Sequence, residues 1–232
     1  MSATQTNDVE TKKAWDHYWS SKKTRILYDV IAEIYRRVLI RPSLNHFIRK
    51  HFKSGAQVLH AGCGSGQVDS NIRKHIQITA LDISPNALEI YKRENGQDAK
   101  TIQGSIFSIP LADGSMDGVY NLGVMEHFYE DDISRILKEF YRVTTPTGKL
   151  VLFWPPEFGL SVLFFKALKI IFAKVFRNPD IQFHPDEVCR LKSRAHAEQM
   201  LKAAGFQIDE YYFGPRDFFT YSVVIAKKID QK

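Results

Sequence analysis

Three glycines at alternate positions form the part of this sequence most directly suited to chemistry. Gly62, Gly64 and Gly66 follow the apolar end of a short strand, and a helical pattern begins at Gln67. Glycine suits a backbone that takes positive φ or that a ligand approaches closely. A strand that turns through such a loop into a helix directs free N–H groups and the positive helix end at its ligand. The spacing therefore predicts a site for a nucleotide-type cofactor.

The glycine spacing separates two kinds of cofactor loop. A dinucleotide-binding fingerprint has the pattern G-x-G-x-x-G, whose third glycine packs the helix against the strand. Here the third glycine is Gly66 and Gln67 follows it, so the pattern is G-x-G-x-G. This pattern resembles motif I of the seven-strand (class I) S-adenosylmethionine-dependent methyltransferases.

Further segments continue the resemblance in the order that the family has. Residues 78–82 read as a second strand that ends in Asp82, whose carboxylate can accept hydrogen bonds from both ribose hydroxyls. Ser84 and Pro85 then begin a helix as its N-cap and first residue. Segments that resemble the family's later motifs are 104–117, 119–127, 142–150 and 201–206. Over residues 55–229 the sequence is thus similar to the type 11, UbiE-like small-molecule group.

The resemblance implies that the cofactor is S-adenosyl-L-methionine and that the product is S-adenosyl-L-homocysteine. It also implies a site at the carboxyl ends of successive strands, where sheets of this kind bind ligands. The residues that it places there are His60, Ala61, Gly62, Cys63, Gly64, Gly66, Asp82, Ile83, Ser105, Ile106, Asn121, Leu122 and Gly123.

Two positions depart from the family pattern. The first strand usually ends in Asp or Glu, which holds the cofactor's amino group, and here that residue is His60. A neutral imidazole accepts one hydrogen bond but supplies no negative charge. Ser105 stands where the family has an Asp for the adenine amino group, and a hydroxyl accepts less strongly than a carboxylate. These losses predict a cofactor affinity lower by on the order of 1–3 kcal/mol.

Methyl transfer from a sulfonium is an in-line displacement of an activated leaving group. Holding the nucleophile and the methyl in line at about 3 Å removes much of the barrier, and a base is needed only for an acceptor that loses a proton. His127, after the motif IV strand, is the candidate base, and a helix-start histidine bonded to backbone is the equal alternative. His184 is a second candidate. No Cys and His spacing resembles that of a metal site.

The elements around these residues are expected to alternate between strand and helix. The pattern predicts strands at 56–60, 77–82, 99–103, 117–122 and 148–154, and helices at 67–75, 85–94, 130–142 and 193–204. This alternation indicates a doubly wound, mostly parallel α/β sheet with helices on both faces. Strands at 206–213 and 218–227 resemble the family's antiparallel C-terminal pair, which completes a seven-strand Rossmann-like fold within a domain of residues 55–232.

A helical extension is predicted before this domain, at residues 12–54, after a disordered start at 1–11. Trp15, Tyr18 and Trp19 form one face of a short helix. These aromatics either pack on the body or lie over the cofactor as a partial lid, in which Tyr18 and Trp19 face the sulfonium cation. An apolar stripe then predicts a helix at 24–41 that Pro42 ends, and a further helix with Ser43 as N-cap.

A cap insertion is predicted at about 157–190, and its central segment is both apolar and basic. Within 158–177, four lysine and arginine side chains share one helical face and apolar residues fill the rest. Lysines this central argue against a membrane span. Two interpretations stay open, a helix that caps the substrate and an interfacial helix at a membrane surface.

Composition and charge bear on partners and location. The chain of 232 residues is 44% hydrophobic and 25% charged, which is typical of a globular protein, and its two cysteines suit a reducing cytosol. Residues 12–53 hold eleven Lys or Arg and three acids, a net charge of +8, whereas the whole chain carries +6. The polar first ten residues lack a secretory signal, so a cytoplasmic location is expected, with peripheral membrane contact as an extension.

Three functions remain open from the sequence. The favoured one is a methyltransferase for a small-molecule or lipid-like acceptor. An RNA methyltransferase would use the basic extension on phosphates, although residues 121–124 are not the N-P-P-Y or D-P-P-Y tetrad of base methylation. The third is a cofactor-binding protein without catalysis, which His60 and Ser105 would explain.

Overall fold

The structure is a computed structural model that describes residues 12–19, 33–159 and 187–229. Several predictions fall outside the described residues. They are the disorder at 1–11, the first part of the 24–41 helix, nearly all of the 158–177 helix, and His184.

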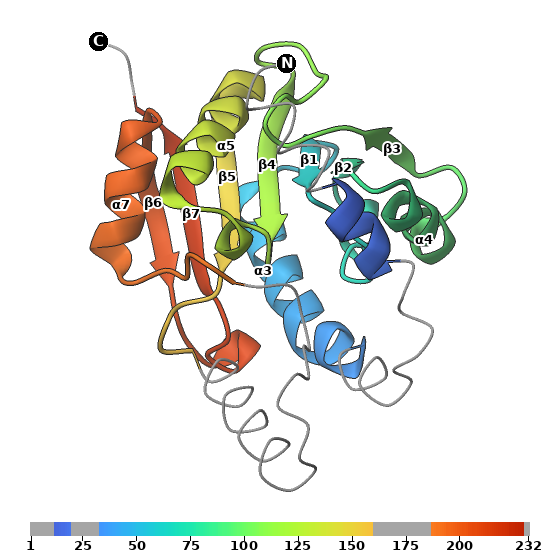
Figure 1. Ribbon diagram of the computed structural model, residues 1–232, viewed down its shortest axis with the longest axis horizontal. Helices are drawn as coiled ribbons and strands as arrows, with labels where there is room; N and C mark the ends of the chain where they lie inside the picture. Colours follow the sequence, from blue (N-terminus) through green and yellow to red (C-terminus); the bar gives the residue numbers. More distant parts are fainter. Residues whose placement is uncertain (1–11, 20–32, 160–186, 230–232) are drawn as a thin grey trace, which may run out of the picture.

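One sheet of seven strands forms the centre of the molecule, in the order β3-β2-β1-β4-β5-β7-β6 (Figure 1). Its strands are β1 (Gln57–Ala61), β2 (Gln77–Asp82), β3 (Lys100–Gln103), β4 (Met116–Leu122), β5 (Thr144–Trp154), β6 (Phe206–Tyr212) and β7 (Ser222–Lys228). The first five are parallel, whereas β7 runs antiparallel to both β5 and β6. The predicted doubly wound sheet with an antiparallel C-terminal pair is confirmed.

Helices cover both faces of this sheet (Figure 1). The α-helices are α3 (Arg41–His51), α4 (Pro85–Asn95), α5 (Glu130–Val143) and α7 (Arg194–Ala203). One apolar core joins α5 and α7 to alternate strand residues such as Leu59 and Val119. A second core joins α3 to their neighbours Val58 and Tyr120 on the other face. This period of two is what a strand buried on both sides requires.

The switch point of the sheet lies between β1 and β4, where the strand order reverses. In open α/β sheets this crevice, beyond the carboxyl ends of the strands, is where ligands bind. The glycine loop follows β1 and Gly123 follows β4, so the two predicted segments face each other across the switch point.

The predicted end of a helix at Pro42 is wrong. The chain is helical at 33–35, continues as a π-helix η2 (Arg36–Ile40) and passes directly into α3. Pro42 lies in the first turn of α3, where a missing N–H costs little. The predicted N-cap Ser43 is instead buried inside the helix, and Leu44 and Phe47 beside it pack into the core.

Two other element predictions need correction. Residues 67–75 form turns and a 3₁₀-helix η3 (Ile72–Lys74), because Asp69 turns inward and Gly66 accepts a short-range bond from its amide. The last strand begins at 222 rather than 218. A 3₁₀-helix η5 (Pro215–Asp217) precedes it, and Phe218 and Phe219 both take positive φ, which a strand cannot include.

Two of the helix starts predicted from capping residues, those at Ser84 and Ser193, are confirmed. The Ser84 hydroxyl accepts from the Ala87 amide at 3.2 Å at the start of α4. Ser193 does the same for the His196 amide at 3.1 Å at the start of α7. Each cap satisfies an N–H group that the first helical turn leaves without a partner.

Replacing Arg142 with lysine is expected to lower the free energy of unfolding by about 1–2 kcal/mol. The guanidinium donates to the carbonyls of Leu111 at 2.8 Å and Ile109 at 2.7 Å and pairs with Glu139, so it fastens the loop before β4 to α5. A lysine cannot reach all of these acceptors at once. Urea unfolding measures the effect.

The matched control is Arg135→Lys on the same helix. Arg135 pairs with Asp132 at 3.0 Å on the surface, so its replacement should change the unfolding free energy by less than about 0.5 kcal/mol. Equal effects of the two variants would contradict the bracing role of Arg142.

Candidate functional site

The glycine loop has the backbone that its sequence predicts. Gly62, Gly64 and Gly66 take φ values of 71°, 50° and 61°. A Cβ on Gly66 would lie 2.3 Å from the Tyr91 ring, and a Cβ on Gly64 would lie 2.6 Å from the indole of Trp19. The loop therefore needs glycine both for its conformation and for close approach.

Asp82, at the end of β2, faces this loop. Its Oδ2 accepts a hydrogen bond from the Gly64 amide at 2.8 Å, and its Oδ1 accepts one from the Ser84 amide at 2.9 Å. Burial raises the pKa of the Asp82 carboxyl, whereas the amides of Ser84 and Gly64 lower it. A carboxylate oxygen can accept more than one bond, so the group fits the ribose hydroxyls that the resemblance assigns to it.

His60 is hydrogen-bonded to a buried acid, Asp69. Its Nδ1 is 2.7 Å from Oδ2 of Asp69, and the Tyr91 hydroxyl donates to the same oxygen at 2.8 Å. The Tyr120 ring stacks on the imidazole with centroids 4.2 Å apart. Asp69 and His60 are 0% and 2% exposed. The negative charge that His60 itself cannot supply is thus present directly behind it, on the buried Asp69 carboxylate.

The helix at residues 12–19 lies over the glycine loop (Figure 1). Trp19 covers Gly64, and the Trp15 ring lies 5.0 Å from that of His127. The Asp16 carboxylate accepts hydrogen bonds from the Ser84 hydroxyl at 2.6 Å and from the Asn86 amide group at 3.0 Å. These bonds fasten the helix to the start of α4. The aromatics therefore pack on the body at the cofactor end of the sheet, and that the helix covers the cofactor as a lid stays a prediction.

The other predicted site residues occupy the same edge of the sheet in different ways. Asn121 is fully buried and donates to the carbonyl of Ala61 at 2.7 Å, so its side chain joins β4 to β1. Ser105 accepts from a neighbouring amide at 3.2 Å and Ile106 is buried beside it. Leu122 is the last residue of β4, and the loops at the strand ends hold Cys63, Ile83 and Gly123. Tyr18 packs edge-on against Trp15 and Trp19.

The structure adds residues that the sequence reasoning missed. Asp16 directly follows Trp15 within the aromatic pattern, and Asp69 lies three residues after Gly66. Only this closeness to the two patterns could have indicated them. Glu126 precedes the candidate base, and its Oε1 lies 4.0 Å from Nε2 of His127.

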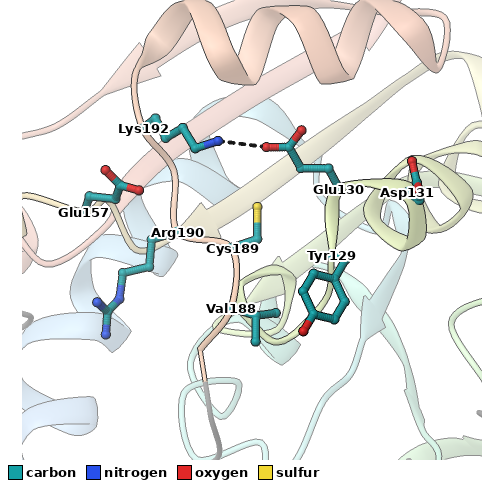
Figure 2. Close-up of a pocket in the computed structure, with 8 residues that line it drawn as sticks. All are labelled: Tyr129, Glu130, Asp131, Glu157, Val188, Cys189, Arg190 and Lys192. Carbon is teal, nitrogen blue, oxygen red and sulfur yellow. Dashed lines mark hydrogen bonds and ion pairs between the residues drawn. The ribbon is translucent and has the colours of Figure 1, made fainter.

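A surface cavity of about 400 Å³ lies beside the segment that follows β4, since the amides of two of its lining residues donate to the Glu126 carbonyl (Figure 2). Its lining residues are Tyr129, Glu130, Asp131, Glu157, Val188, Cys189, Arg190 and Lys192. Lys192 pairs with Glu130 at 3.0 Å across it. None of the lining residues belongs to the predicted cofactor site, so the cavity carries no functional assignment.

The described residues offer neither a metal site nor a membrane span. Within the described ranges, no three His, Cys, Asp or Glu side chains gather in a way that could hold a metal ion. Among the helices in those same ranges, none is long and apolar enough to cross a membrane.

Sheet order, switch point and glycine loop together define a Rossmann-like α/β protein with a nucleotide-type cofactor site. Residues 59–152 match the family model described as "Methyltransferase domain". The chain thus contains a segment that matches a methyltransferase domain, and its fold is that of the class I, Rossmann-like S-adenosylmethionine-dependent methyltransferases.

Two curated relatives illustrate the range of similarity. Over 112 residues the chain is 38% identical to malonyl-[acyl-carrier protein] O-methyltransferase of Pectobacterium atrosepticum, covering 47% of this chain and 43% of that protein. Over 228 residues it is 25% identical to demethylmenaquinone methyltransferase of a Geobacillus species, covering 84% and 95%. The chain spans about half the length of the malonyl-[acyl-carrier protein] enzymes that it matches.

Solved structures show the same fold. The 1,6-didemethyltoxoflavin-N1-methyltransferase of Burkholderia thailandensis aligns with a TM-score of 0.67 at 15% identity, over 99% of this chain and 92% of that one. Magnesium protoporphyrin IX methyltransferase of Synechocystis PCC 6803 aligns with a TM-score of 0.61 at 16% identity, over 82% of each chain.

Proposed function

We propose that this chain transfers the methyl group of S-adenosyl-L-methionine to a small-molecule or lipid-like acceptor and releases S-adenosyl-L-homocysteine. One observation carries the proposal. The three positive-φ glycines, the Asp82 carboxylate and the aromatic helix at 12–19 converge on the switch point of a methyltransferase fold. Each of these groups suits a different part of that cofactor.

The residues present fit the cofactor, which when bound supplies an activated methyl group on a sulfonium. Asp82 would hold the ribose hydroxyls, and the glycine loop would let the backbone approach. Trp15 and Trp19 offer aromatic faces, which attract a cation such as the sulfonium. The protein's contribution is then to exclude water and to hold the acceptor in line with the methyl.

The class of acceptor is inferred from two kinds of support. The relatives are named for malonyl-[acyl-carrier protein] and demethylmenaquinone, which favours this class over the RNA alternative. Phe158 and Phe218 are 48% and 62% exposed, and the Phe213 ring lies 5.1 Å from Phe158 and 5.5 Å from Phe219. These partly exposed phenylalanines, which lie after β5 and between β6 and β7, suit an apolar acceptor.

Calorimetric titration with S-adenosyl-L-methionine and S-adenosyl-L-homocysteine tests the cofactor, with NAD as the control. Binding of both at micromolar concentrations, without binding of NAD, would support the proposal and justify screening apolar acceptors. Absence of binding at millimolar ligand would reject it. Binding with no turnover on any acceptor would favour the cofactor-binding protein without catalysis.

We also propose a cytoplasmic location with peripheral membrane contact through residues 158–177. The support is the apolar and basic sequence of this segment, of which Phe158, at its described start, is one of the exposed aromatics. Pelleting with anionic vesicles tests the contact. Failure of the chain to sediment with vesicles of high anionic content would remove it.

A further inference from the structure

A buried carboxyl lies beside the carboxyl end of β4 without a complete set of hydrogen-bond partners. Glu126 is 4% exposed, and its Oε2 atom has no partner in the described part of the chain. A buried polar atom without a partner forfeits the hydrogen bonds that water would give it. A bound ligand that donates a hydrogen bond to Oε2 would explain why this carboxyl is buried here.

The position of Glu126 points to the methyl acceptor as that ligand. A Cβ built on Gly123 would lie 3.5 Å from Oε1 of Glu126 and 3.3 Å from the Tyr221 hydroxyl. Gly123 has a φ of 67° and follows β4, the neighbour of β1 at the switch point. The carboxyl and the hydroxyl therefore flank a residue of the predicted site, next to His127 and the aromatic helix above it.

Charged and titratable groups face Glu126 from each element around it. On its own 3₁₀-helix η4 (Met125–His127), the His127 imidazole is 4.0 Å away, and the Tyr221 hydroxyl approaches from the segment before β7. The segment that begins at Glu187 passes behind it, since the Glu126 carbonyl accepts from two of its amides at 2.7 and 3.0 Å.

These surroundings set the protonation of the carboxyl. Burial is the largest influence and raises the pKa of Glu126 from 4.5 to about 8. Its own backbone amide lowers the pKa, Glu187 raises it and Arg190 lowers it. The carboxyl is therefore mainly protonated at neutral pH and becomes a base as the pH rises through about 8. A base with this pKa suits the deprotonation of a weakly acidic hydroxyl.

We propose that Glu126 is the catalytic base that takes the proton of a hydroxyl-bearing methyl acceptor, with the Tyr221 hydroxyl positioning that acceptor. The inference rests on the proposed function and deepens it. An oxygen lone pair of the acceptor forms the bond to the methyl carbon, the carbon–sulfur bond breaks, and its electron pair returns to sulfur. The hydroxyl proton passes to the Glu126 carboxylate, so the products are the methyl ether, S-adenosyl-L-homocysteine and neutral Glu126.

The two cofactor forms provide a test that needs no acceptor. S-adenosyl-L-methionine carries a positive sulfonium and S-adenosyl-L-homocysteine carries none, so the ratio of their dissociation constants reports negative charge near the methyl. Calorimetric titration of the full chain at about pH 6.5 and about pH 9 gives this ratio. Ionisation of Glu126 should increase the preference for S-adenosyl-L-methionine by about fivefold or more between the two pH values.

The Glu126→Gln variant should lose this increase. Glutamine resembles the protonated carboxyl that dominates at neutral pH, so the variant is expected to fold, and urea unfolding checks this. Glu130→Gln is the matched control, because Glu130 lies four residues further on with its side chain 54% exposed. That control should keep the increase seen in the unchanged chain.

The outcomes separate this inference from the proposed function. A ratio that rises in the unchanged chain and in Glu130→Gln, but not in Glu126→Gln, supports the base. Binding of both ligands with the same pH response in all three proteins would overturn the inference and leave the proposed function intact. Binding of neither ligand at any pH would overturn the proposed function, and the inference with it.

Discussion

Replacing Asp69 with alanine is expected to lower the free energy of unfolding by about 3–5 kcal/mol. The carboxylate is 0% exposed, and one oxygen serves both the His60 imidazole at 2.7 Å and the Tyr91 hydroxyl at 2.8 Å. Its removal leaves both groups buried without this partner, and each carries the cost of lost hydration. Urea unfolding followed by tryptophan fluorescence measures the change.

Two further variants make this result specific. Asp98→Ala removes an acid whose side chain is 85% exposed and which meets Arg73 at 3.5 Å, so the loss should stay below about 0.5 kcal/mol. Tyr91→Phe removes one bond of the buried network and should cost about 1 kcal/mol. A loss of less than about 1 kcal/mol for Asp69→Ala would show that the network does not stabilise the fold.

Replacing Asp82 with asparagine is expected to weaken the binding of S-adenosyl-L-methionine by roughly 100-fold, or about 3 kcal/mol. The variant loses charge-assisted bonds to the cofactor hydroxyls. It also turns an amide N–H₂ group toward the backbone N–H of Gly64 or Ser84, which both donate to the carboxylate. Calorimetric titration of the variant measures the affinity.

The control for this second prediction is Asp117→Asn. The Asp117 carboxylate accepts a hydrogen bond from the Gln57 amide at 2.8 Å at the amino end of β1. The Asp117→Asn variant therefore loses a similar bond at the opposite ends of the strands from the cofactor loop. Its affinity for S-adenosyl-L-methionine should stay within about twofold of that of the unchanged chain. An affinity for Asp82→Asn within about threefold, in a variant that unfolds at normal urea concentrations, would falsify the assignment of Asp82.

Local patterns determined most of the fold from the sequence alone. The alternation of apolar strands with amphipathic helices, and the capping residues Ser84 and Ser193, depend on neighbours within a few positions. The same holds for the glycine loop, because positive φ is a requirement of the backbone itself. These features could be predicted because their physical causes lie in short stretches of chain.

Some local signals gave the wrong element because tertiary packing outweighed them. Pro42 does not end its helix, since a π-helical turn before it lets the first turn of α3 include a residue without an N–H. Residues 67–75 do not form the predicted helix, because Asp69 is held inward by His60 and Tyr91 from other elements.

The sequence determined the methyltransferase resemblance, the sheet and the positions of the cofactor loop. Only the tertiary structure decided how polar groups far apart in the chain meet. It gave His60 a buried carboxylate, placed Trp19 on Gly64, and brought the Tyr221 hydroxyl beside Gly123. The physical reason is that such contacts join residues whose separation along the chain carries no periodic signal, so only packing of the folded chain creates them.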